Sequence, residues 1–217
     1  MSNRNHHLII ALLGALGTTG VSHAVDVRLQ LSTTPGFDKN EEEFKSSNNS
    51  TTYTLDQDEG VQVGLILTWV EPTGVSFLRG VEVSYRTEGG TNAIDDELET
   101  TQIGIGGRLG LGWVIIPGLR LEAGARATLG YAETDDAQDS YGPAGNVLIV
   151  YAVHESLSGW SYQAGVFLGL NYQWPQGLLI GIELGYEYTC AMLENDGISH
   201  TVSGDGTTVG INVGYSF

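Results

Sequence analysis

Alternating hydrophobic and polar positions run through most of this chain. From residue 207 to 217 the odd positions from 209 onward are large and apolar, and the residues between them are small or polar. Strict period-2 alternation is typical of a β-strand whose two faces meet different surroundings. The same pattern occurs in eight segments, at about 25–37, 59–71, 74–88, 99–116, 119–134, 159–174, 177–193 and 206–217. The chain is therefore predicted to be an all-β protein.

Short and long connections alternate between these segments. Pro and Gly lie adjacent or one residue apart at 72–74, 117–118 and 175–177, and such pairs between two strand patterns mark hairpin turns. Longer polar stretches occupy roughly 38–58, 89–98, 135–158 and 194–206. This order predicts an antiparallel up-and-down sheet with short turns at one end and long loops at the other.

The polar face of the strands indicates which side of such a sheet is inside. A lipocalin-like barrel turns its apolar face inward around a ligand, whereas an outer-membrane barrel turns it outward to lipid. The polar face here is mostly Gly, Ser, Thr and Gln, which would cover a water-facing exterior poorly. It also carries five arginines and five acids: Asp26, Arg28, Glu82, Arg86, Arg108, Arg120, Glu122, Arg126, Glu183 and Glu187. Because buried charges need partners, we predict a lumen charge network inside an eight-stranded antiparallel up-and-down transmembrane β-barrel.

The aromatic residues support this orientation. One group lies near the short-turn ends of the strands: Trp69, Trp113, Trp174, Tyr215 and Phe217. A second group lies toward the long-loop ends: Tyr85, Tyr131, Trp160, Tyr162, Tyr186 and Tyr188. Two aromatic bands separated by aliphatic residues are typical of the interfacial girdles of a membrane barrel.

The first 24 residues have a pattern of their own. Arg4 precedes a short apolar run at 8–17, and small residues surround Ala24. The apolar run is shorter than the roughly 18 residues of a membrane-spanning helix, so the pattern is typical of a secretory signal peptide. We predict a cleaved signal peptide at 1–24 and one β-barrel domain at 25–217. Cys190 is the single cysteine, so no internal disulfide framework is expected in an exported chain.

The last strand carries a further signal. Val209, Ile211, Val213, Tyr215 and Phe217 alternate up to a terminal aromatic residue. This arrangement resembles the insertion signal that the outer-membrane assembly machinery recognises in bacterial barrels. With the signal peptide and the eight strands, the chain is similar to the small outer-membrane barrels of the OmpA-transmembrane, OmpX and opacity-protein type. The resemblance is architectural and covers 25–217. It implies an outer-membrane location in a Gram-negative bacterium, short turns in the periplasm and long loops outside the cell.

This topology places most of the negative charge. Of the 26 acidic residues, five face the predicted lumen and Glu71 lies at a periplasmic turn, which leaves 20 on or beside the outer loops. Clusters at 38–43, 95–99 and 133–139 predict either a solvated loop surface or a rim that loosely binds Ca²⁺ or Mg²⁺ against anionic lipopolysaccharide. None has an EF-hand pattern, so no defined metal site and no cofactor is predicted. The net charge of −17 argues against nucleic acid as a partner.

One outer loop contains an unusually apolar segment. Residues 146–153, NVLIVYAV, are too hydrophobic for an ordinary loop. Two interpretations are open. The segment forms an extra hairpin arm with the top of the sixth strand, which would suit adhesion or strand addition by a cell-surface partner, or it is a strand extension packed against neighbouring loops.

Three classes of function fit such a barrel. Eight strands leave an interior just wide enough for side chains, which favours a filled lumen and a structural or surface-interaction role in adhesion or envelope integrity. A small-solute pore or gated channel is the alternative. Small outer-membrane barrels also include lipid A-modifying enzymes with His and Ser two residues apart, a spacing that His154 and Ser156 have, and His200 and Ser203 form a looser pair. Both pairs fall in predicted loops and lack the further motif residues, so we predict a barrel that is not an enzyme.

Overall fold

The computed structural model describes residues 24–34, 39–46, 49–54, 56–57, 60–70, 74–91, 97–135, 140–144, 147–151, 157–195 and 198–217. The regular elements in these ranges are all β-strands. No helix long and apolar enough to cross a membrane occurs within them. The predicted signal peptide at 1–24 lies outside the described residues except for Ala24.

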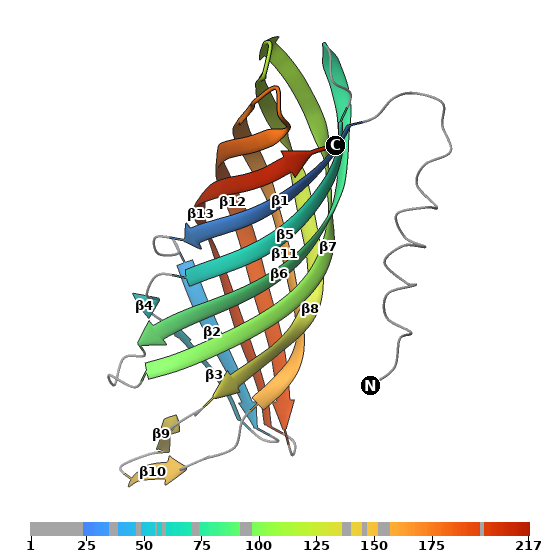
Figure 1. The fold of residues 1–217 in the computed structure, drawn as a ribbon. Coiled ribbons are helices and arrows are strands. Elements are labelled where there is room, and N and C mark those ends of the chain that lie inside the picture. Colours follow the sequence, from blue (N-terminus) through green and yellow to red (C-terminus); the bar gives the residue numbers. More distant parts are fainter. Residues whose placement is uncertain are drawn as a thin grey trace, which may run out of the picture.

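Eight long strands form a closed antiparallel barrel (Figure 1). In pairing order they are β1 (Ala24–Thr34), β5 (Gly60–Val70), β6 (Val75–Thr91), β7 (Glu97–Ile116), β8 (Leu119–Asp135), β11 (Leu157–Gln173), β12 (Leu178–Asn195) and β13 (Ile198–Ser216). The last strand, β13, pairs with β1 and closes the sheet. The predicted all-β fold with eight up-and-down barrel strands is confirmed.

The strands are staggered around the barrel. Residues directly opposite one another on neighbouring strands lead once around the barrel from Asp26 on β1 to Gly206 on β13. The residues between them are Thr68, Gly80, Arg108, Arg126, Gly165 and Glu187. Across the seam, however, Asp26 pairs directly with Ser216, ten residues further along β13. Eight strands with such a stagger tilt relative to the barrel axis and leave an interior that side chains fill.

Glycines with positive φ lie in the three short turns. Gly74, Gly118 and Gly177 have φ values of 73°, 84° and 93°, a region that residues with a Cβ rarely adopt. Each of these glycines also accepts a hydrogen bond from a neighbouring strand pair, and the amide of Val114 donates to Gly74 O at 3.0 Å. The amide of Gln173 donates to Gly118 O at 2.7 Å, and the amide of Ser216 donates to Gly177 O at 2.8 Å. The short turns therefore lie side by side at one end of the barrel.

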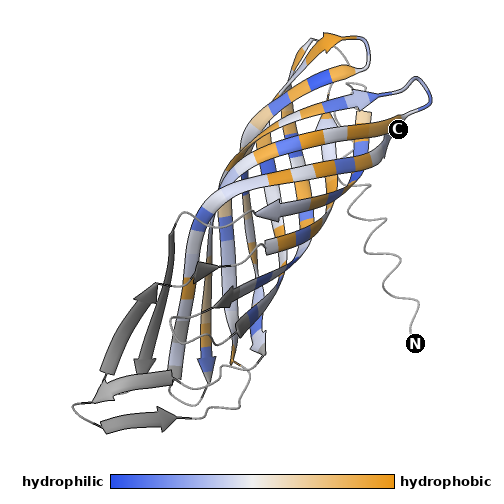
Figure 2. Cartoon of the chain, turned by 90° about the vertical axis from the view of Figure 1, so that its left-hand side faces the viewer, coloured by the Kyte–Doolittle hydropathy of each residue, from blue (hydrophilic) through white to orange (hydrophobic). Residues whose placement is uncertain are grey.

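Hydrophobic and hydrophilic residues alternate along the barrel strands (Figure 2), and they lie on opposite faces of the wall. Outward side chains are mostly large and apolar and stay exposed; Leu29, Ile105 and Leu129 are 56, 65 and 67 % exposed. Inward positions hold glycines, hydroxyls, amides and charges, and Gln102 and Arg108 on β7 are 5 and 1 % exposed. The apolar face therefore points outward and the charged face lines the bore, as the alternation predicts.

The stretch predicted as the first long loop contains strands. β2 (Lys39–Ser46) pairs with β3 (Asn49–Thr54) and with the first part of β13, and β4 (Asp56–Gln57) pairs with β6. The fourth predicted loop is shorter than expected because β13 begins at Ile198 rather than at 206. The first and fourth loops were predicted to be too long. The hydrogen bonds between strands join backbone groups, so a polar segment can form or extend a strand without any hydrophobic alternation in its sequence.

The apolar segment of the third long loop forms a hairpin of its own. β10 (Val147–Tyr151) pairs with β9 (Ser140–Ala144) in a separate two-stranded sheet. Of the two interpretations of 146–153, the one that paired the segment with the top of the sixth barrel strand, β11, was wrong about the partner. The segment nearest in sequence is favoured because closing a short loop costs the least conformational entropy.

Candidate functional site

All ten residues of the predicted lumen charge network lie inside the barrel. They extend from β1, β6, β7, β8 and β12, and none is more than 7 % exposed. Each occupies an inward position of the two-residue alternation of its strand. The structure joins them by ion pairs into two groups, one at the short-turn end of the bore and one further toward the long loops.

The first group, called here the turn-end cluster, consists of Asp26, Arg28, Arg120 and Glu122. Arg28 donates from both terminal nitrogens to Glu122, with Nη1 2.7 Å from Oε2 and Nη2 2.6 Å from Oε1. Arg28 Nη2 also lies 2.8 Å from Asp26 Oδ2, and Arg120 Nε donates to Glu122 Oε1 at 2.7 Å. Arg120 Nη2 donates to Asp26 as well. The cluster has two positive and two negative groups and is neutral.

Pairs within the turn-end cluster cross the bore. In the ring of eight strands, β1 and β8 are four places apart and therefore lie on opposite sides. The pairs Arg28–Glu122 and Asp26–Arg120 both join these two strands. Fork-to-fork pairing of guanidinium and carboxylate is among the strongest charge-assisted hydrogen bonds. The bore is thus spanned by tightly paired side chains at this level.

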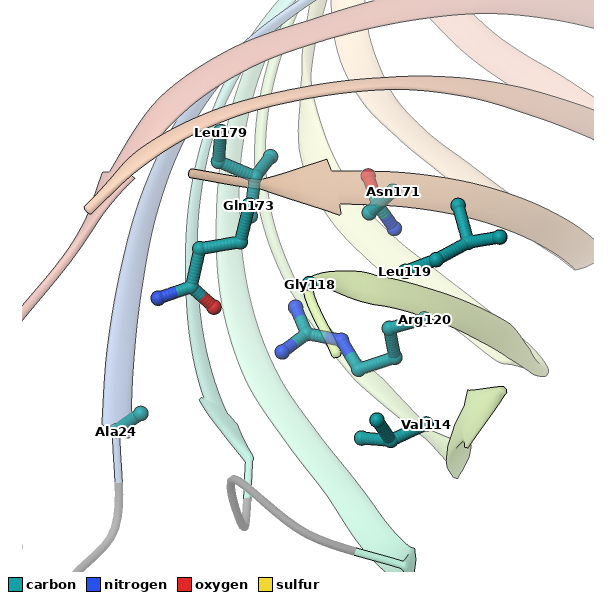
Figure 3. A pocket seen from close by; sticks show the side chains of 8 residues that line it. All are labelled: Ala24, Val114, Gly118, Leu119, Arg120, Asn171, Gln173 and Leu179. Carbon is teal, nitrogen blue, oxygen red and sulfur yellow. The ribbon is translucent and has the colours of Figure 1, made fainter. Parts of the chain in front are cut away.

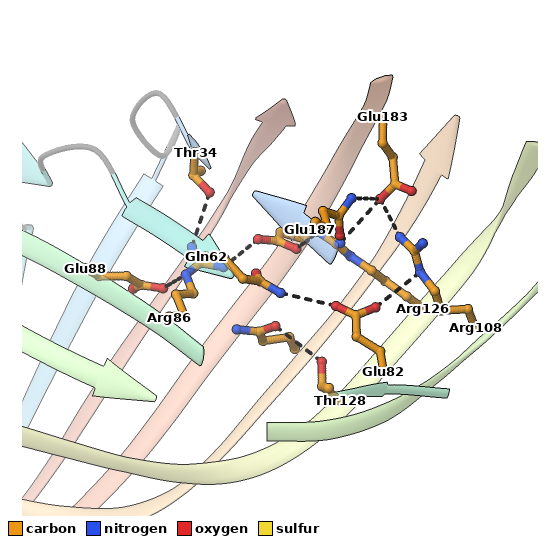
Figure 4. A network of polar contacts seen from close by, with 12 residues as sticks. Thr34, Gln62, Glu82, Arg86, Glu88, Arg108, Arg126, Thr128, Glu183 and Glu187 are labelled. Carbon is orange, nitrogen blue, oxygen red and sulfur yellow. Dashed lines mark hydrogen bonds and ion pairs between the residues drawn. The ribbon is translucent and has the colours of Figure 1, made fainter. Parts of the chain in front are cut away.

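The second group, called here the mid-bore cluster, is drawn in Figure 4. It consists of Glu82, Arg86, Glu88, Arg108, Arg126, Glu183 and Glu187. Glu183 Oε1 binds Arg108 and lies 3.5 Å from Arg126 Nη1. Arg108 Nε is also 3.2 Å from Glu82 Oε2. One carboxylate is therefore shared by two neighbouring arginines.

Another pair of the mid-bore cluster crosses the barrel. Arg86 on β6 and Glu187 on β12 lie on opposite sides of the ring, and Arg86 Nη1 donates to Glu187 Oε1 at 2.5 Å. The second oxygen of Glu187 accepts from Arg126. Arg86 also pairs with Glu88 and donates to Thr34 Oγ1 at 3.4 Å. The bore is consequently bridged at two levels.

Sequence reasoning missed Glu88 and the amides of this network. Glu88 is 3 % exposed, whereas it was assigned to the acidic outer loops. Its even position on β6, in step with Glu82 and Arg86, was the signal that could have placed it inside. Gln30 donates to Glu183 Oε1 at 2.9 Å, and its inward position on β1 carried the same signal.

The residues of the predicted insertion signal line the outer face of β13. Val209, Ile211, Val213, Tyr215 and Phe217 are 44 to 77 % exposed. The amide of Phe217 donates to Val25 O at 3.0 Å, so the seam with β1 continues past the end of β13. A role in insertion stays a prediction.

Most of the two His and Ser pairs lies outside the part of the chain that the structure describes. His154 and Ser156 lie outside the described residues, and so does the side chain of His200. Ser203 lies on β13 opposite Cys190 of β12. Among the side chains that the structure describes, no group of three or more His, Cys, Asp or Glu is arranged to hold a metal ion.

Comparison with known proteins identifies the fold. Neither a protein-family model nor a curated protein sequence matches the chain. The solved structure of the outer membrane protein OprG from Pseudomonas aeruginosa is 14 % identical, with a TM-score of 0.51 over 91 % of this chain and 97 % of OprG. Neisserial surface protein A is 16 % identical, with a TM-score of 0.41 over 86 % and 96 % of the two chains. The attachment invasion locus protein Ail of Yersinia pestis is 12 % identical, with a TM-score of 0.45 over 91 % and 100 %.

The likeness to OprG, the closed ring of eight strands, the apolar outer wall and the charged bore agree with one another. The chain has the fold of the small eight-stranded outer-membrane β-barrels.

Proposed function

We propose that this protein is a non-catalytic outer-membrane barrel that presents acidic loops at the cell surface and keeps its bore closed. The observation that carries this proposal is the set of ion pairs joining opposite walls, Arg28–Glu122 and Asp26–Arg120 near the turns and Arg86–Glu187 further in. Paired charges removed from bulk water resist separation, because each partner left alone in the bore would be strongly destabilised. A bore held in this way supports a structural or surface-interaction role over transport.

Solute flux tests the closed bore. Liposomes containing the purified protein are expected to swell in sugar or amino-acid solutions no faster than empty liposomes, whereas a general porin gives rapid swelling. The quadruple variant Arg28→Ala/Glu122→Ala/Arg86→Ala/Glu187→Ala removes one bridge at each of the two levels together with its charges, and its swelling rate is expected to rise. Wild-type flux comparable to that of the porin would overturn the proposal in favour of a small-solute pore.

The acidic segments at 38–43, 95–99 and 133–139, at or near the long-loop end, support contact with lipopolysaccharide through divalent cations. Both surfaces are anionic, so a bridging cation is the simplest attraction between them. Binding of purified lipopolysaccharide is expected to require millimolar Ca²⁺ or Mg²⁺ and to be lost on chelation. Binding that is equally strong in a chelator would contradict the bridge.

Export by the segment 1–24 and insertion through the β13 signal belong to the same proposal. The expected mature protein begins at Val25 and fractionates with the outer membrane, where N-terminal sequencing and density fractionation detect it. Replacement of Phe217 by Ser, with Thr207→Ser as a conservative control on the same outward face, is expected to lower the yield of inserted protein. Equal yields would remove Phe217 from the insertion signal.

The β9–β10 hairpin supports a surface-interaction role. Its second strand, VLIVY, is apolar and forms a sheet separate from the barrel. We expect that replacing 140–151 by a short Gly–Ser linker preserves the barrel and reduces attachment of expressing bacteria to host cells or to one another. Attachment that survives this deletion would exclude the hairpin as the adhesive segment.

Absence of catalysis has its own test. Lipid A from cells that express the protein is expected to have the same mass spectrum as lipid A from cells that carry an empty vector. Loss of an acyl chain that depends on His154 and Ser156 would replace this proposal with a lipid A-modifying activity.

A further inference from the structure

A cavity of about 70 Å³ lies inside the barrel at its short-turn end (Figure 3). It is enclosed by the first residues of β1, β8 and β12 and the last residues of β7 and β11, including Ala24, Val114, Arg120, Asn171, Gln173 and Leu179. The volume is the space open to the centre of a water-sized sphere, and one water needs roughly 10–15 Å³ of it, so the cavity has room for about five waters. This volume is large enough for a small guest molecule.

Asn171 is the polar group that this cavity leaves without a partner. Its side chain is 1 % exposed, and neither Nδ2 nor Oδ1 has a hydrogen-bond partner in the structure. Asn171 lies between Arg120 on β8 and Gly181 on β12, and a Cβ at position 181 would clash with its Oδ1. A buried amide with no hydrogen bonds is costly, so this geometry calls for a guest that both donates and accepts.

Arg120 of the turn-end cluster lines the cavity, so the charges of the cluster constrain the charge of the guest. The Arg120 guanidinium points into the cavity (Figure 3), and its Nε and Nη2 are already bound to Glu122 and Asp26. An anionic guest beside Arg120 would be repelled by the carboxylates of Asp26 and Glu122. A cationic guest would be repelled by the arginines of the same cluster. The cluster is neutral as a whole, so a neutral guest avoids both repulsions. Beyond it, the Arg28–Glu122 pair closes the bore.

We propose that this cavity is a hydrated vestibule, open to the short-turn side, that binds water and neutral hydrogen-bonding molecules of amide size on Asn171 and ends at the turn-end cluster. The inference rests on the proposed closed bore, and it specifies how far solutes enter the bore from the short-turn end. Polar solutes reach Asn171 from the turn end, but they do not reach the amide Asn212, which faces the bore on β13 next to Gln30 and does not line the cavity.

Cysteine accessibility tests the vestibule. In a Cys190→Ala background, Asn171→Cys is made in the full chain, and the protein in liposomes is treated with iodoacetamide, a small, neutral, water-soluble amide. Asn212→Cys is the matched control, because Asn212 is also an inward amide, 0 % exposed and without a hydrogen-bond partner in the structure. Mass spectrometry is expected to show alkylation of Asn171→Cys at least tenfold faster than that of Asn212→Cys. A maleimide carrying a polyethylene glycol chain is expected to modify neither.

A second variant keeps the test valid if Asn171→Cys does not fold. Failure to fold would be seen on a gel as the loss of the band that shifts when the sample is boiled. Gln173→Cys lines the same cavity nearer to its mouth and is expected to react at least as fast as Asn171→Cys. If neither cavity position reacts faster than Asn212→Cys while the liposomes remain impermeable, the vestibule is refuted and the closed bore stands. If all three positions react equally fast and solute flux is high, the closed bore itself is refuted.

Discussion

At the scale of single residues, the bore places like charges side by side and then shares a counter-ion between them. Arg108 on β7 and Arg126 on β8 are direct cross-strand partners, an arrangement that is destabilising for two cations alone. Glu183 reaches both from β12, and the Arg108 guanidinium also lies 4.3 Å from the ring centroid of Phe167. The stability of each arginine therefore depends on residues from other strands.

Glu122 is the residue whose charge the turn-end cluster most depends on. Glu122→Gln leaves Arg28 and Arg120 to share Asp26 alone, and we expect the free energy of unfolding to fall by about 3 kcal/mol, because removing one partner strands buried charge. Urea unfolding in detergent micelles, followed by tryptophan fluorescence, measures this. Glu133→Gln, an exposed position on the same strand, is the control, with an expected change within about 0.5 kcal/mol. Equal effects of the two variants would contradict the importance of the pair.

Two adjacent glycines on β7 give a second test. A Cβ at Gly106 would clash with the carbonyl oxygen of Ala127 and with Thr128, whereas a Cβ at Gly107 would have Gly80 O at 3.7 Å as its only close neighbour. We expect Gly106→Ala to destabilise the barrel by about 1–3 kcal/mol, through overpacking. Gly107→Ala is expected to be neutral or slightly stabilising, since it restricts the unfolded chain. The same urea titration separates them, and a larger loss at Gly107 would be inconsistent with this packing.

At the scale of the elements, β13 changes partner along its length. Its second half pairs with β1 and closes the barrel, while residues 199–205 pair with β2, and β12 follows it almost throughout. The barrel wall thus continues outward beyond the end of β1 at Thr34. Polar strands extend the wall at the long-loop end of the barrel, which explains why the loops there are shorter than the polar sequence predicts.

The seam is expected to be less tolerant of proline than the β2–β3 hairpin. Ile211 lies between Leu31 and Ile182, so Ile211→Pro puts a residue without an amide proton into a strand that is paired on both sides. We expect loss of the folded species, which migrates differently from the boiled protein on a gel. Thr52→Pro in β3 is the control and is expected to keep the heat-modifiable band, because β3 is not needed for closure. A normal folded band from Ile211→Pro would count against the seam.

At the scale of the whole molecule, the barrel is inside-out relative to a water-soluble protein. Apolar side chains remain exposed around its circumference, and the ion pairs are buried in the bore. A surface of this kind is stable where the surroundings are hydrocarbon, because all backbone groups of the closed sheet are paired within the protein.

This orientation can be tested by placing an arginine at different depths of the outer wall, because a charge in the middle of a bilayer lowers stability more than one near its surface. Leu109 and Ile116 on β7 are 59 and 55 % exposed, one in the middle of the wall and the other at the turn end. In liposomes, Leu109→Arg is expected to lower the free energy of unfolding by about 2–4 kcal/mol and Ile116→Arg by about 0–1 kcal/mol. Equilibrium urea unfolding in lipid vesicles provides both values. Equal costs at the two positions would argue that the outer wall does not face a bilayer.

Most of the barrel could be predicted from local patterns, but its extension by β2 and β3 at the long-loop end could not. The alternation of Ile103, Ile105 and Leu109 against Gln102 and Arg108 fixes the faces of β7 without any knowledge of its neighbours. Residues 39–54 have no such alternation, so only pairing with β13 reveals β2 and β3 as strands. The third loop was half predictable, since the apolar segment indicated a strand but not its partner β9.

By itself, the sequence determined the eight barrel strands, their short turns, which side faces out and ten of the charged residues that face in. These properties follow from period-2 alternation and from Pro and Gly at the turns, which act within a few residues. Only the tertiary structure decided that Arg28 binds Glu122, 94 residues away, that Glu88 joins the network, and that Asn171 borders a cavity. Those relationships depend on closure and on the ten-residue stagger, because these set which inward side chains meet across the bore.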